Sequence, residues 1–310
     1  MILDLYQQYG IDTAQPGHKH YRPGWVNIQC PYCAIAGSDG YHLGFNLDSG
    51  YFYCWRCGSH PVKAVLARLL KLHSAQVEEI LINYRLKQRS RLVDAGNASK
   101  LIKIGKRKFK YPSEVNKMKP SQSNYLAGRG FDPEYLEEVW KLKGTSPFSV
   151  LDKISYKFRI LLPIIWKDRE VSFQCRDYTD KQAIKYMACP EEREIAHHKH
   201  ILYGHPSLWE TRKAIVVEGA ADVWRFKGKA CGTLGTGYTA EQVRLLARVF
   251  DKLVIMFDPE PLAQVRAEKL KSELSFRGVK TFMYNELPDG VDPGKLHQDD
   301  ADYILKELKL

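Results

Sequence analysis

The chain has 310 residues and a formal net charge of +11, from 47 lysine and arginine residues against 36 aspartate and glutamate residues. Hydrophobic residues make up 44% of it and aromatic residues 12%, which supplies packed cores and excludes wholesale disorder or collagen-like repeats. The length predicts two or three domains. No stretch approaches the roughly 18 apolar residues of a membrane helix, and the N-terminus lacks the features of a signal peptide. We therefore expect a cytoplasmic chain with a polyanionic partner and no membrane partner.

Four of the seven cysteines form two Cys-x-x-Cys pairs. Cys30 and Cys33 are followed, after twenty residues, by Cys54 and Cys57. This arrangement is typical of zinc sites, because each short turn directs two sulfurs toward one point. Four protein ligands close the coordination shell, so we expect a structural Zn²⁺ rather than a catalytic one. A redox-active pair is the alternative, and two pairs around a hairpin disfavour it.

A hairpin is predicted between the two cysteine pairs. Apolar residues alternate along 41–47, as in a half-buried strand, and residues 48–50 form a turn before a returning strand at 51–53. Helical spacing then predicts one helix at 61–72 and a second around Ile80. Together these elements indicate a zinc ribbon with trailing helices.

Aromatic and basic side chains are interleaved along this ribbon. Such a surface suits single-stranded nucleic acid, whose bases stack on rings while cations meet phosphates. About half of the aromatic residues are expected to fill the small core of the ribbon instead. Trp55 and Arg56 lie inside the second cysteine pair, where we expect them to be exposed. His42 and His60 are interpreted as surface or packing residues, because four cysteines already complete a zinc site.

A basic connector follows the ribbon. Residues 85–110 contain ten basic residues and one acid, Asp94, and part of this stretch has no apolar period. We predict a zinc-ribbon domain at 1–84 and a flexible linker at 85–112. A charge run is usually only a solvated segment, but this one could also hold a nucleic-acid backbone electrostatically.

Strands and helices alternate in the last third of the chain. The expected elements are a strand at 214–217, a helix around 222–226, a Gly/Thr-rich turn at 231–237, a helix at 243–250 opened by a capping box, a strand at 253–257, a helix at 261–276 and a strand at 279–284. The strands are largely continuous apolar runs, so this alternation predicts an α/β arrangement with a parallel sheet covered on both faces. The sequence contains no P-loop, so no ATP-driven motor is expected.

Acidic residues follow the predicted strands at their carboxyl ends, where parallel sheets bind ligands. Glu218 follows the first strand, Asp258 and Glu260 follow the next, and Asp292 comes after the last. Clustered carboxylates stay ionised only with cations among them, and hard oxygen ligands suit Mg²⁺ or Mn²⁺. A pair of such ions could orient an in-line phosphoryl transfer. Any single acid could be an ordinary loop residue, but the joint pattern, with Asp222 in Glu-Gly-x-x-Asp, favours a metal site.

These acidic motifs resemble the Toprim domain, and nearly the whole chain resembles the DnaG-type primases of bacteria and phages. The paired cysteines match the zinc ribbon of that family. The middle of the chain matches it in Tyr125-Leu-Ala-Gly-Arg129-Gly-Phe, Phe158-Arg159-Ile-Leu-Leu-Pro-Ile, Lys185-Tyr186-Met-Ala-Cys-Pro-Glu and Leu202-Tyr203-Gly204. The resemblance implies an α+β chain overall: a zinc-ribbon β domain, then a primase core with a first subdomain at 113–210 and a Toprim subdomain, containing the parallel α/β sheet, at 211–310.

The resemblance also implies roles for individual residues. The implied catalytic residues are Glu218, Asp222, Asp258, Glu260 and Asp292, and all except Asp222 are implied ligands of Mg²⁺ or Mn²⁺. The implied nucleotide- or template-binding residues are Arg129, Arg159, Arg176, Lys185, Tyr186 and Lys199, in addition to Trp55 and Arg56 of the ribbon. Taken singly, each of these cations is more often a surface charge.

Several positions depart from the family pattern. Asp258-Pro-Glu260 stands in place of Asp-x-Asp, Gly294 in place of a second loop acid, and Ala188 in place of an asparagine. One metal ligand could therefore be missing. No counterpart of the family's C-terminal helicase-binding domain is expected.

The implied function is DNA-templated synthesis of short RNA primers from NTPs on single-stranded DNA. A separate replicative helicase would be the partner, in a bacterial or phage-infected cell, and the source would be a phage or mobile element. Two alternatives remain. One is a Toprim nuclease or topoisomerase-like protein, and the other is a non-catalytic single-strand-binding replication adaptor with a decayed metal site.

Overall fold

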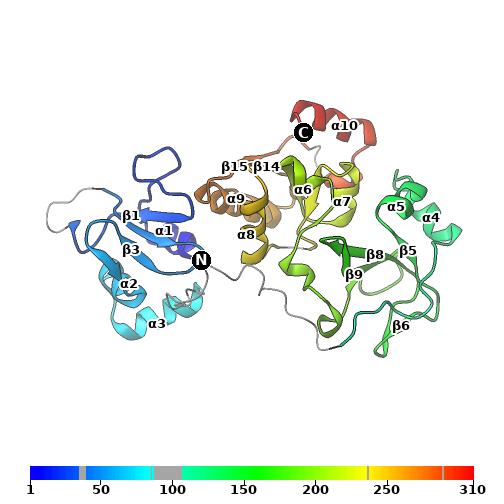
Figure 1. Cartoon of the computed structure of the whole chain (residues 1–310), viewed down its shortest axis with the longest axis horizontal. Helices are drawn as coiled ribbons and strands as arrows, with labels where there is room; N and C mark the ends of the chain where they lie inside the picture. Colours follow the sequence, from blue (N-terminus) through cyan, green and yellow to red (C-terminus); the bar gives the residue numbers. More distant parts are fainter. Residues whose placement is uncertain (35–39, 85, 87–106, 236, 288–289) are drawn as a thin grey trace. The chain divides into compact units, whose positions relative to one another are not determined.

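A computed structural model describes the chain at residues 1–34, 40–84, 86, 107–235, 237–287 and 290–310. Most of the linker predicted at 85–112 lies outside these described residues. The chain divides into two compact units, Met1–Ala98 with Ser272–Lys280 and Ser99–Lys271 with Thr281–Leu310 (Figure 1). Each unit has its own hydrophobic core.

The first unit is built on a four-stranded antiparallel sheet in the order β1-β2-β3-β4. Its strands are β1 (Trp25–Ile28), β2 (Leu43–Asn46), β3 (Phe52–Cys54) and β4 (Gly58–His60), and its helices are α1 (Ile2–Gln8), α2 (Val62–Leu70) and α3 (Ser74–Asn83). The hairpin and the two trailing helices expected from the sequence are confirmed. Phe45 pairs with Phe52 across the hairpin, and both rings are buried in the core that α1, α2 and α3 complete.

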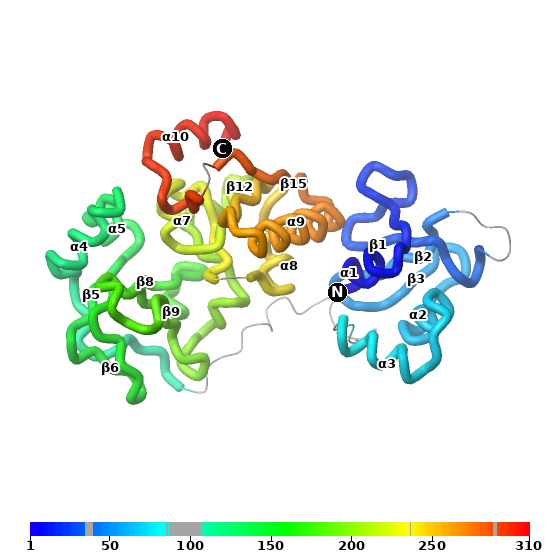
Figure 2. The backbone as a smooth tube through the Cα atoms, turned by 180° about the vertical axis from the view of Figure 1, so that it is seen from behind, coloured from blue at the N-terminus to red at the C-terminus, as the bar shows by residue number. Residues whose placement is uncertain are grey.

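The second unit begins with an antiparallel sheet in the order β10-β9-β8-β5. Its elements are α4 (Pro120–Ala127), α5 (Pro133–Val139), β5 (Lys143–Gly144), β6 (Val150–Leu151), β7 (Ile154–Ser155), β8 (Arg159–Trp166), β9 (Arg169–Asp177), β10 (Tyr186–Ala188), η2 (Glu191–Arg193) and η3 (His198–His200). The apolar run of β8 is buried because its side chains enter hydrophobic clusters on both faces of this sheet. Helices α4 and α5 lie side by side (Figure 2).

A five-stranded sheet follows, in the order β11-β13-β12-β14-β15. The elements are β11 (Tyr203–Gly204), α6 (Leu208–Thr211), β12 (Lys213–Val217), α7 (Ala220–Arg225), β13 (Ala230–Gly232), α8 (Ala240–Val249), β14 (Lys252–Ile255), α9 (Pro261–Phe276), β15 (Lys280–Met283), η4 (Pro293–Lys295) and α10 (Gln298–Glu307). Strand β12 pairs in parallel with β14, which confirms the predicted parallel sheet, and also with β13, whereas β11 runs antiparallel to β13.

The turn predicted at 231–237 is wrong at its start. Ala230–Gly232 form strand β13, which lies between β11 and β12. The three residues are small and lead into a Gly/Thr-rich stretch, so the local pattern indicated a turn. Pairing of Val216 with Cys231 and of Val217 with Gly232 turns this segment into a buried parallel strand.

The two parts of the predicted core, 113–210 and 211–310, share one hydrophobic cluster. Trp140 and Ile160 from the first part pack in it with Ile215 and Trp224 from the second. The acids at the ends of β12 and β14 therefore rest on the same core as the antiparallel sheet. Among the described residues, no helix is long and apolar enough to cross a membrane.

One buried amide joins α4 to the sheet, and its removal tests this packing. Gln122 is fully buried, donates from Nε2 to the carbonyl groups of Thr145 (3.1 Å) and Arg159 (2.9 Å), and accepts from the Lys119 N–H (2.7 Å). We expect Gln122→Ala to lower the free energy of unfolding by about 2–4 kcal/mol, because buried polar groups lose their partners. Asn124→Ala, on the exposed side of the same helix, should change it by less than about 0.5 kcal/mol. Urea unfolding measures both, and equal effects would contradict this account.

Candidate functional site

A cavity of about 260 Å³ lies in the second unit beyond the carboxyl ends of β12 and β14. Its charged and polar lining consists of the carboxyl groups of Glu218, Asp222, Asp258 and Asp292, the basic side chains of Arg129, Arg176 and Lys185, and Gln174 and Tyr186. Acids from separate loops and helices thus face basic residues across one opening. Glu260 is not among the lining residues, although its charge acts on Glu218 and Asp258.

Parallel strand pairing brings the acids together. Val216 of β12 is in register with Ile255 of β14, so both strands end at the same edge of the sheet. Glu218 comes directly after β12, and Asp258 comes three residues after Ile255. Both carboxylates consequently lie at the edge where ligands bind in open parallel sheets.

Burial makes ionisation of these acids unfavourable. Burial and, next, the charge of Asp258 raise the pKa of Glu218 to about 7, although the Asp258 N–H and Arg266 offset part of the rise. Burial also raises the pKa of Asp222 to about 7, with Asp258 as the next contributor. The pKa of Asp258 itself is raised by burial and then by Asp292. The carboxyl groups therefore compete for negative charge and favour a cation between them.

Two buried oxygens fit such a cation. Glu218 Oε1 and Asp258 Oδ1 have no hydrogen-bond partner. Carboxylate oxygens are the ligands that Mg²⁺ and Mn²⁺ prefer. Within the described part of the chain, no three of the cavity carboxylates have oxygens within 4.8 Å of one another. An ion bound here would therefore have to draw the side chains closer together.

Asp222 differs from the other acids because the backbone occupies its oxygens. It accepts a hydrogen bond from the Gly219 N–H at 2.7 Å and another from the backbone of Gly294. A Cβ atom at Gly294 would lie 2.6 Å from Asp222 Oδ1. An acidic side chain at position 294 could enter only if Asp222 moved. Asp222 thus joins the loop after β12 to the Asp292–Gly294 loop.

Arg225, one turn further along α7, holds a third segment in place. Its side chain is buried and donates to the carbonyl groups of Gly130 (2.9 Å) and Arg129 (3.0 Å), with Phe131 4.1 Å from the guanidinium carbon. Gly130 needs its positive φ of 73° to make this turn. Arg225 therefore positions the segment that carries Arg129 into the cavity. Nothing in the local sequence pattern indicated this role, because only the folded structure shows that this arginine is buried against the Arg129–Gly130 turn.

The basic residues implied by the resemblance fall into different environments. Arg176 lines the cavity, donates to the Tyr125 hydroxyl at 2.7 and 3.0 Å, and lies 4.9 Å from the Tyr186 ring. These contacts fix its guanidinium without neutralising its charge. Lys185 lines the same cavity and is exposed.

Arg159 and Lys199 are instead directed at backbone carbonyl groups. Arg159 is buried, does not line the cavity, and donates to Ile184 O (2.7 Å) and Lys185 O (3.2 Å). The cavity therefore does not include Arg159, which the resemblance implied as a nucleotide- or template-binding residue. Lys199 Nζ donates to Gly237 O at 3.1 Å, and burial lowers its pKa although Glu218 opposes this effect.

Sequence reasoning missed another cation at this site. Lys295 Nζ lies 2.8 Å from Asp292 Oδ2, and this contact raises the pKa of the lysine. The charge of Lys295 also offsets part of the rise in the pKa of Asp258. The spacing of three residues between Asp292 and Lys295 was the available signal, but it is common on protein surfaces.

In the first unit, the four cysteines of the predicted ribbon form one cluster. Their sulfurs all lie within 4.8 Å of one another, with Cys30 and Cys57 at 3.6 Å and Cys33 and Cys54 at 3.7 Å. A tetrahedral zinc ion with Zn–S bonds of about 2.3 Å requires sulfurs about 3.8 Å apart. The cluster therefore fits a structural zinc ion.

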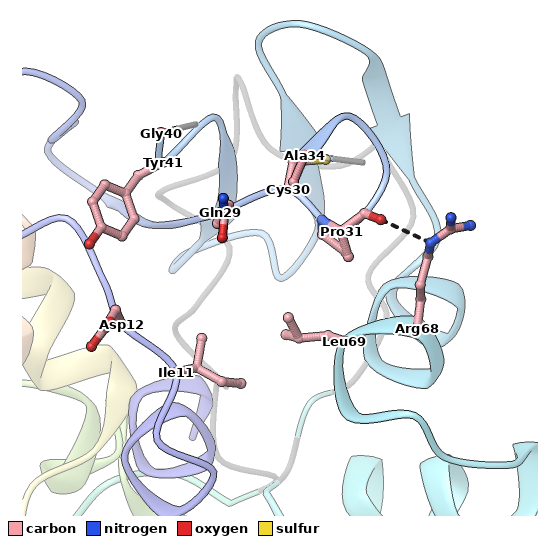
Figure 3. Close-up of a pocket in the computed structure, with 10 residues that line it drawn as sticks. All are labelled: Ile11, Asp12, Gln29, Cys30, Pro31, Ala34, Gly40, Tyr41, Arg68 and Leu69. Carbon is pink, nitrogen blue, oxygen red and sulfur yellow. Dashed lines mark hydrogen bonds between the residues drawn. The ribbon is translucent and has the colours of Figure 1, made fainter. Parts of the chain in front are cut away.

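Neighbouring side chains support the two cysteine turns. His60, expected only at the surface or in packing, has Nε2 3.1 Å from Cys57 Sγ, and its ring stacks on Tyr32 at 4.0 Å. Arg68 of α2 donates to Pro31 O at 2.9 Å, beside a cavity of about 470 Å³ (Figure 3). Helix α2 thus holds the first turn, while β4 brings His60 to the second.

Trp55 and Arg56 are exposed at the second cysteine turn, as expected. The Trp55 side chain is 43% exposed and meets the Trp25 ring edge-on at 5.1 Å. Gly44 lies beneath these two rings, where a Cβ atom would come within 2.6 Å of Trp55. Trp55 therefore has a fixed position with one side open to solvent.

The fold resembles that of bacterial primases: a unit that carries a four-cysteine cluster is followed by a core that contains a Toprim-like sheet. The chain is similar to the zinc-binding and RNA polymerase domains of Aquifex aeolicus primase, with a TM-score of 0.53 and 18% identity over 99% of this chain and 82% of that one. A DnaG primase catalytic domain bound to single-stranded DNA gives a TM-score of 0.52 and 23% identity over 61% of this chain and 71% of that one.

Sequence comparison also points to DNA primases. The chain is 32% identical over 145 residues to the DNA primase of Borreliella burgdorferi, covering 44% of this chain and 26% of that protein. It is 30% identical over 174 residues to the DNA primase of Haemophilus influenzae, covering 52% and 28%. The chain thus spans about a quarter of the length of the curated relatives it matches. No model of a known protein family matches it.

The raised pKa of Glu218 gives a pH-dependent prediction. Between about pH 4.5 and 7 the folded chain binds more protons at Glu218 than the unfolded chain does, so this group's contribution to stability falls as pH rises through that window. Glu218→Gln cannot ionise. Without divalent ions, it should be about 1–3 kcal/mol more stable than wild type at pH 8 and nearly equal at pH 5.

Urea unfolding at the two pH values measures this difference, and Glu286→Gln on the surface is the control with no expected gain. Added Mg²⁺ should stabilise the wild type more than Glu218→Gln, because binding to the folded state adds stability. A Glu218→Gln chain that is no more stable than wild type at pH 8 would contradict the account.

Proposed function

We propose that this chain is a DNA-templated RNA primase, which joins NTPs into short primers on single-stranded DNA. One observation carries the proposal: the acids Glu218, Asp258 and Asp292 share one cavity with the cations Arg176 and Lys185. Nucleotidyl transfer needs both, because cations bind phosphates while carboxylates hold metal ions. The likeness to primase catalytic domains in fold and sequence supports it.

The acids are proposed to have different roles, which follow from their different contacts. Glu218 and Asp258 each have an unpartnered buried oxygen, so they are the proposed ligands of Mg²⁺ or Mn²⁺. Asp292 lines the same cavity and is a further proposed ligand, as is Glu260, which is exposed two residues after Asp258. The bound ion would stabilise the charge that develops during phosphoryl transfer. Asp222 acts as a positioning residue, because its oxygens accept backbone N–H groups.

The basic residues are proposed to bind phosphates of the nucleotide or template. Arg176 is held by Tyr125 and Tyr186, which reduces the entropy it loses when it binds an anion. Arg129 is placed by Arg225, and Lys185 adds an exposed ammonium at the same opening. Lys199 is proposed to support the Gly-rich segment through Gly237 rather than to meet phosphate directly.

The zinc ribbon is proposed to bind the single-stranded template. Trp55 offers an open ring face and Arg56 lies next to it, a combination suited to stacked bases and phosphates. The bound zinc ion would hold the second cysteine turn, and with it these two side chains, in place. In this role the chain would act in the cytoplasm with a separate replicative helicase.

A metal-site variant tests the catalytic proposal. Asp258→Asn should lower primer synthesis by about 10²–10³-fold, because the metal ion that stabilises the transition state loses one of its charged ligands. Glu286→Gln, an exposed acid, should keep wild-type activity. The assay uses labelled NTPs, random and defined single-stranded templates, and Mg²⁺ or Mn²⁺.

Other outcomes of this assay would replace the proposal. Folded wild-type chain that binds single strands but makes no primer at any concentration of either ion would indicate the adaptor function. Cleavage of DNA without NTPs would indicate a nuclease. Full activity in Asp258→Asn would remove this residue from the metal site.

A ribbon variant tests template binding separately. Trp55→Ala should weaken binding to single-stranded DNA by about 1–3 kcal/mol, because a stacking surface is lost. Tyr9→Ala is a matched control, since Tyr9 is also 43% exposed but lies at the end of α1. Fluorescence anisotropy of labelled oligonucleotides gives both affinities, and zinc content verifies that the ribbon is intact. Equal affinities for the two variants would argue against the role of Trp55.

A further inference from the structure

A cluster of histidines lies outside the acidic cavity, in the segment between β10 and β11. His197, His198 and His200 occur within four residues, shortly after Glu194. Ligand atoms of Glu194, His197 and His198 all lie within 4.8 Å of one another. Neither the catalytic proposal nor the sequence motifs use these histidines.

Glu194 is a buried carboxylate with one oxygen satisfied and one not. Oε1 accepts hydrogen bonds from Ser172 Oγ and from His198 Nδ1, each at 2.6 Å. Oε2 has no hydrogen-bond partner and lies 3.9 Å from His197 Nε2, while only 1% of the side chain is exposed. An unpartnered charged oxygen at such a depth is unfavourable unless a cation reaches it.

Three histidine rings are grouped beside this carboxylate. The centroid of the His197 ring lies 4.9 Å from that of the His198 ring, with 14° between the ring planes, and 4.9 Å from that of the His200 ring. His198 Nδ1 lies 2.6 Å from Glu194 Oε1, so it is the ring nitrogen that can share an ion with this carboxylate once its proton has moved to Nε2. His200 Nδ1 is a second buried atom without a partner.

We propose that Glu194, His197 and His198 form a second site for Zn²⁺ or a similar divalent ion, with His200 or a water molecule as a fourth ligand. Imidazole nitrogens with one carboxylate favour ions of this class over Mg²⁺. Ligand atoms around zinc are about 3.3 Å apart, so the rings must move inward by about 1 Å. Their side chains are 22% and 14% exposed, which leaves them room to do so.

Binding would exchange two hydrogen bonds for metal bonds, and the first is that between His198 Nδ1 and Glu194 Oε1. His197 Nδ1 accepts the Lys199 N–H at 3.1 Å, so coordination through Nε2 moves the ring proton to Nδ1 and replaces that hydrogen bond. The ion would join the 194–200 segment to β9, because Glu194 is already bonded to Ser172. Lys199, whose Nζ reaches Gly237 O, lies in the same segment. The site is therefore structural, and it does not depend on the proposed function.

Counting zinc tests the proposal on the full chain. The purified protein is equilibrated with micromolar free Zn²⁺, desalted and analysed by elemental mass spectrometry. Wild type should carry two zinc ions per chain, and His197→Asn/His198→Asn should carry one, held by the cysteines. His297→Asn, an exposed histidine of the same unit, should retain two.

Either of two results would overturn the site: one zinc per wild-type chain, or two in the double variant, which would mean an adventitious ion only. Because the double variant could fail to fold, titration of the wild type with Co²⁺ provides a second measurement. The cysteine site gives thiolate charge-transfer absorption, and the proposed site should add d–d bands without it. Saturation of the thiolate bands with no further spectral change would also overturn the proposal.

Discussion

Carboxylates that repel one another are held together where two parallel strands end, and this constraint governs the second unit. The pairing of Val216 with Ile255 fixes the ends of β12 and β14, which places Glu218 and Asp258 in one small volume. Burial there raises the pKa of both acids. Buried carboxylates this close together lower stability unless a cation lies among them, which supports the proposed metal site.

The surrounding scaffold keeps these acids from moving apart. Helix α7 supplies two anchors one turn apart: Asp222 accepts backbone N–H groups from the loops at 219 and 294, and Arg225 donates to the carbonyl groups at 129 and 130. Both anchors bind backbone groups of the loops. The unpartnered oxygens of Glu218 and Asp258 are therefore not needed to hold the loops in place. The same helix therefore sets the distance between the acidic and the basic halves of the cavity.

Arginines in this chain have opposite roles that depend on their partners. Arg159 and Arg225 are buried and bound to carbonyl groups, so their charge serves the fold. Arg176 is bound to a tyrosine hydroxyl and two aromatic rings at the cavity, so its charge is available to an anion. In the ribbon, too, some side chains serve the fold and others face solvent. Cys30 and Cys54 are buried, while one side of the Trp55 ring is exposed.

Local patterns in the sequence were sufficient to predict many of the elements and the cysteine site. Strand alternation, a capping box and paired Cys-x-x-Cys turns depend on neighbours within a few residues, so the ribbon hairpin, α8 opened by Thr239 and the acids after β12 and β14 could be predicted. Strand β13 was missed because its three small residues become a strand only through pairing with β12.

Side-chain environments were decided by tertiary structure. The sequence could name Arg159 and Arg176 as cations, but only packing directs the first to buried carbonyl groups and the second to the cavity. Glu194 and His197 are only three residues apart, but the hydrogen bond from Ser172 of β9 to Glu194 forms only when the chain folds. The sequence by itself determined which chemical groups this protein has and the elements that carry them. Tertiary structure decided which of those groups are left without a partner, because burial and hydrogen bonding depend on residues far apart in the chain.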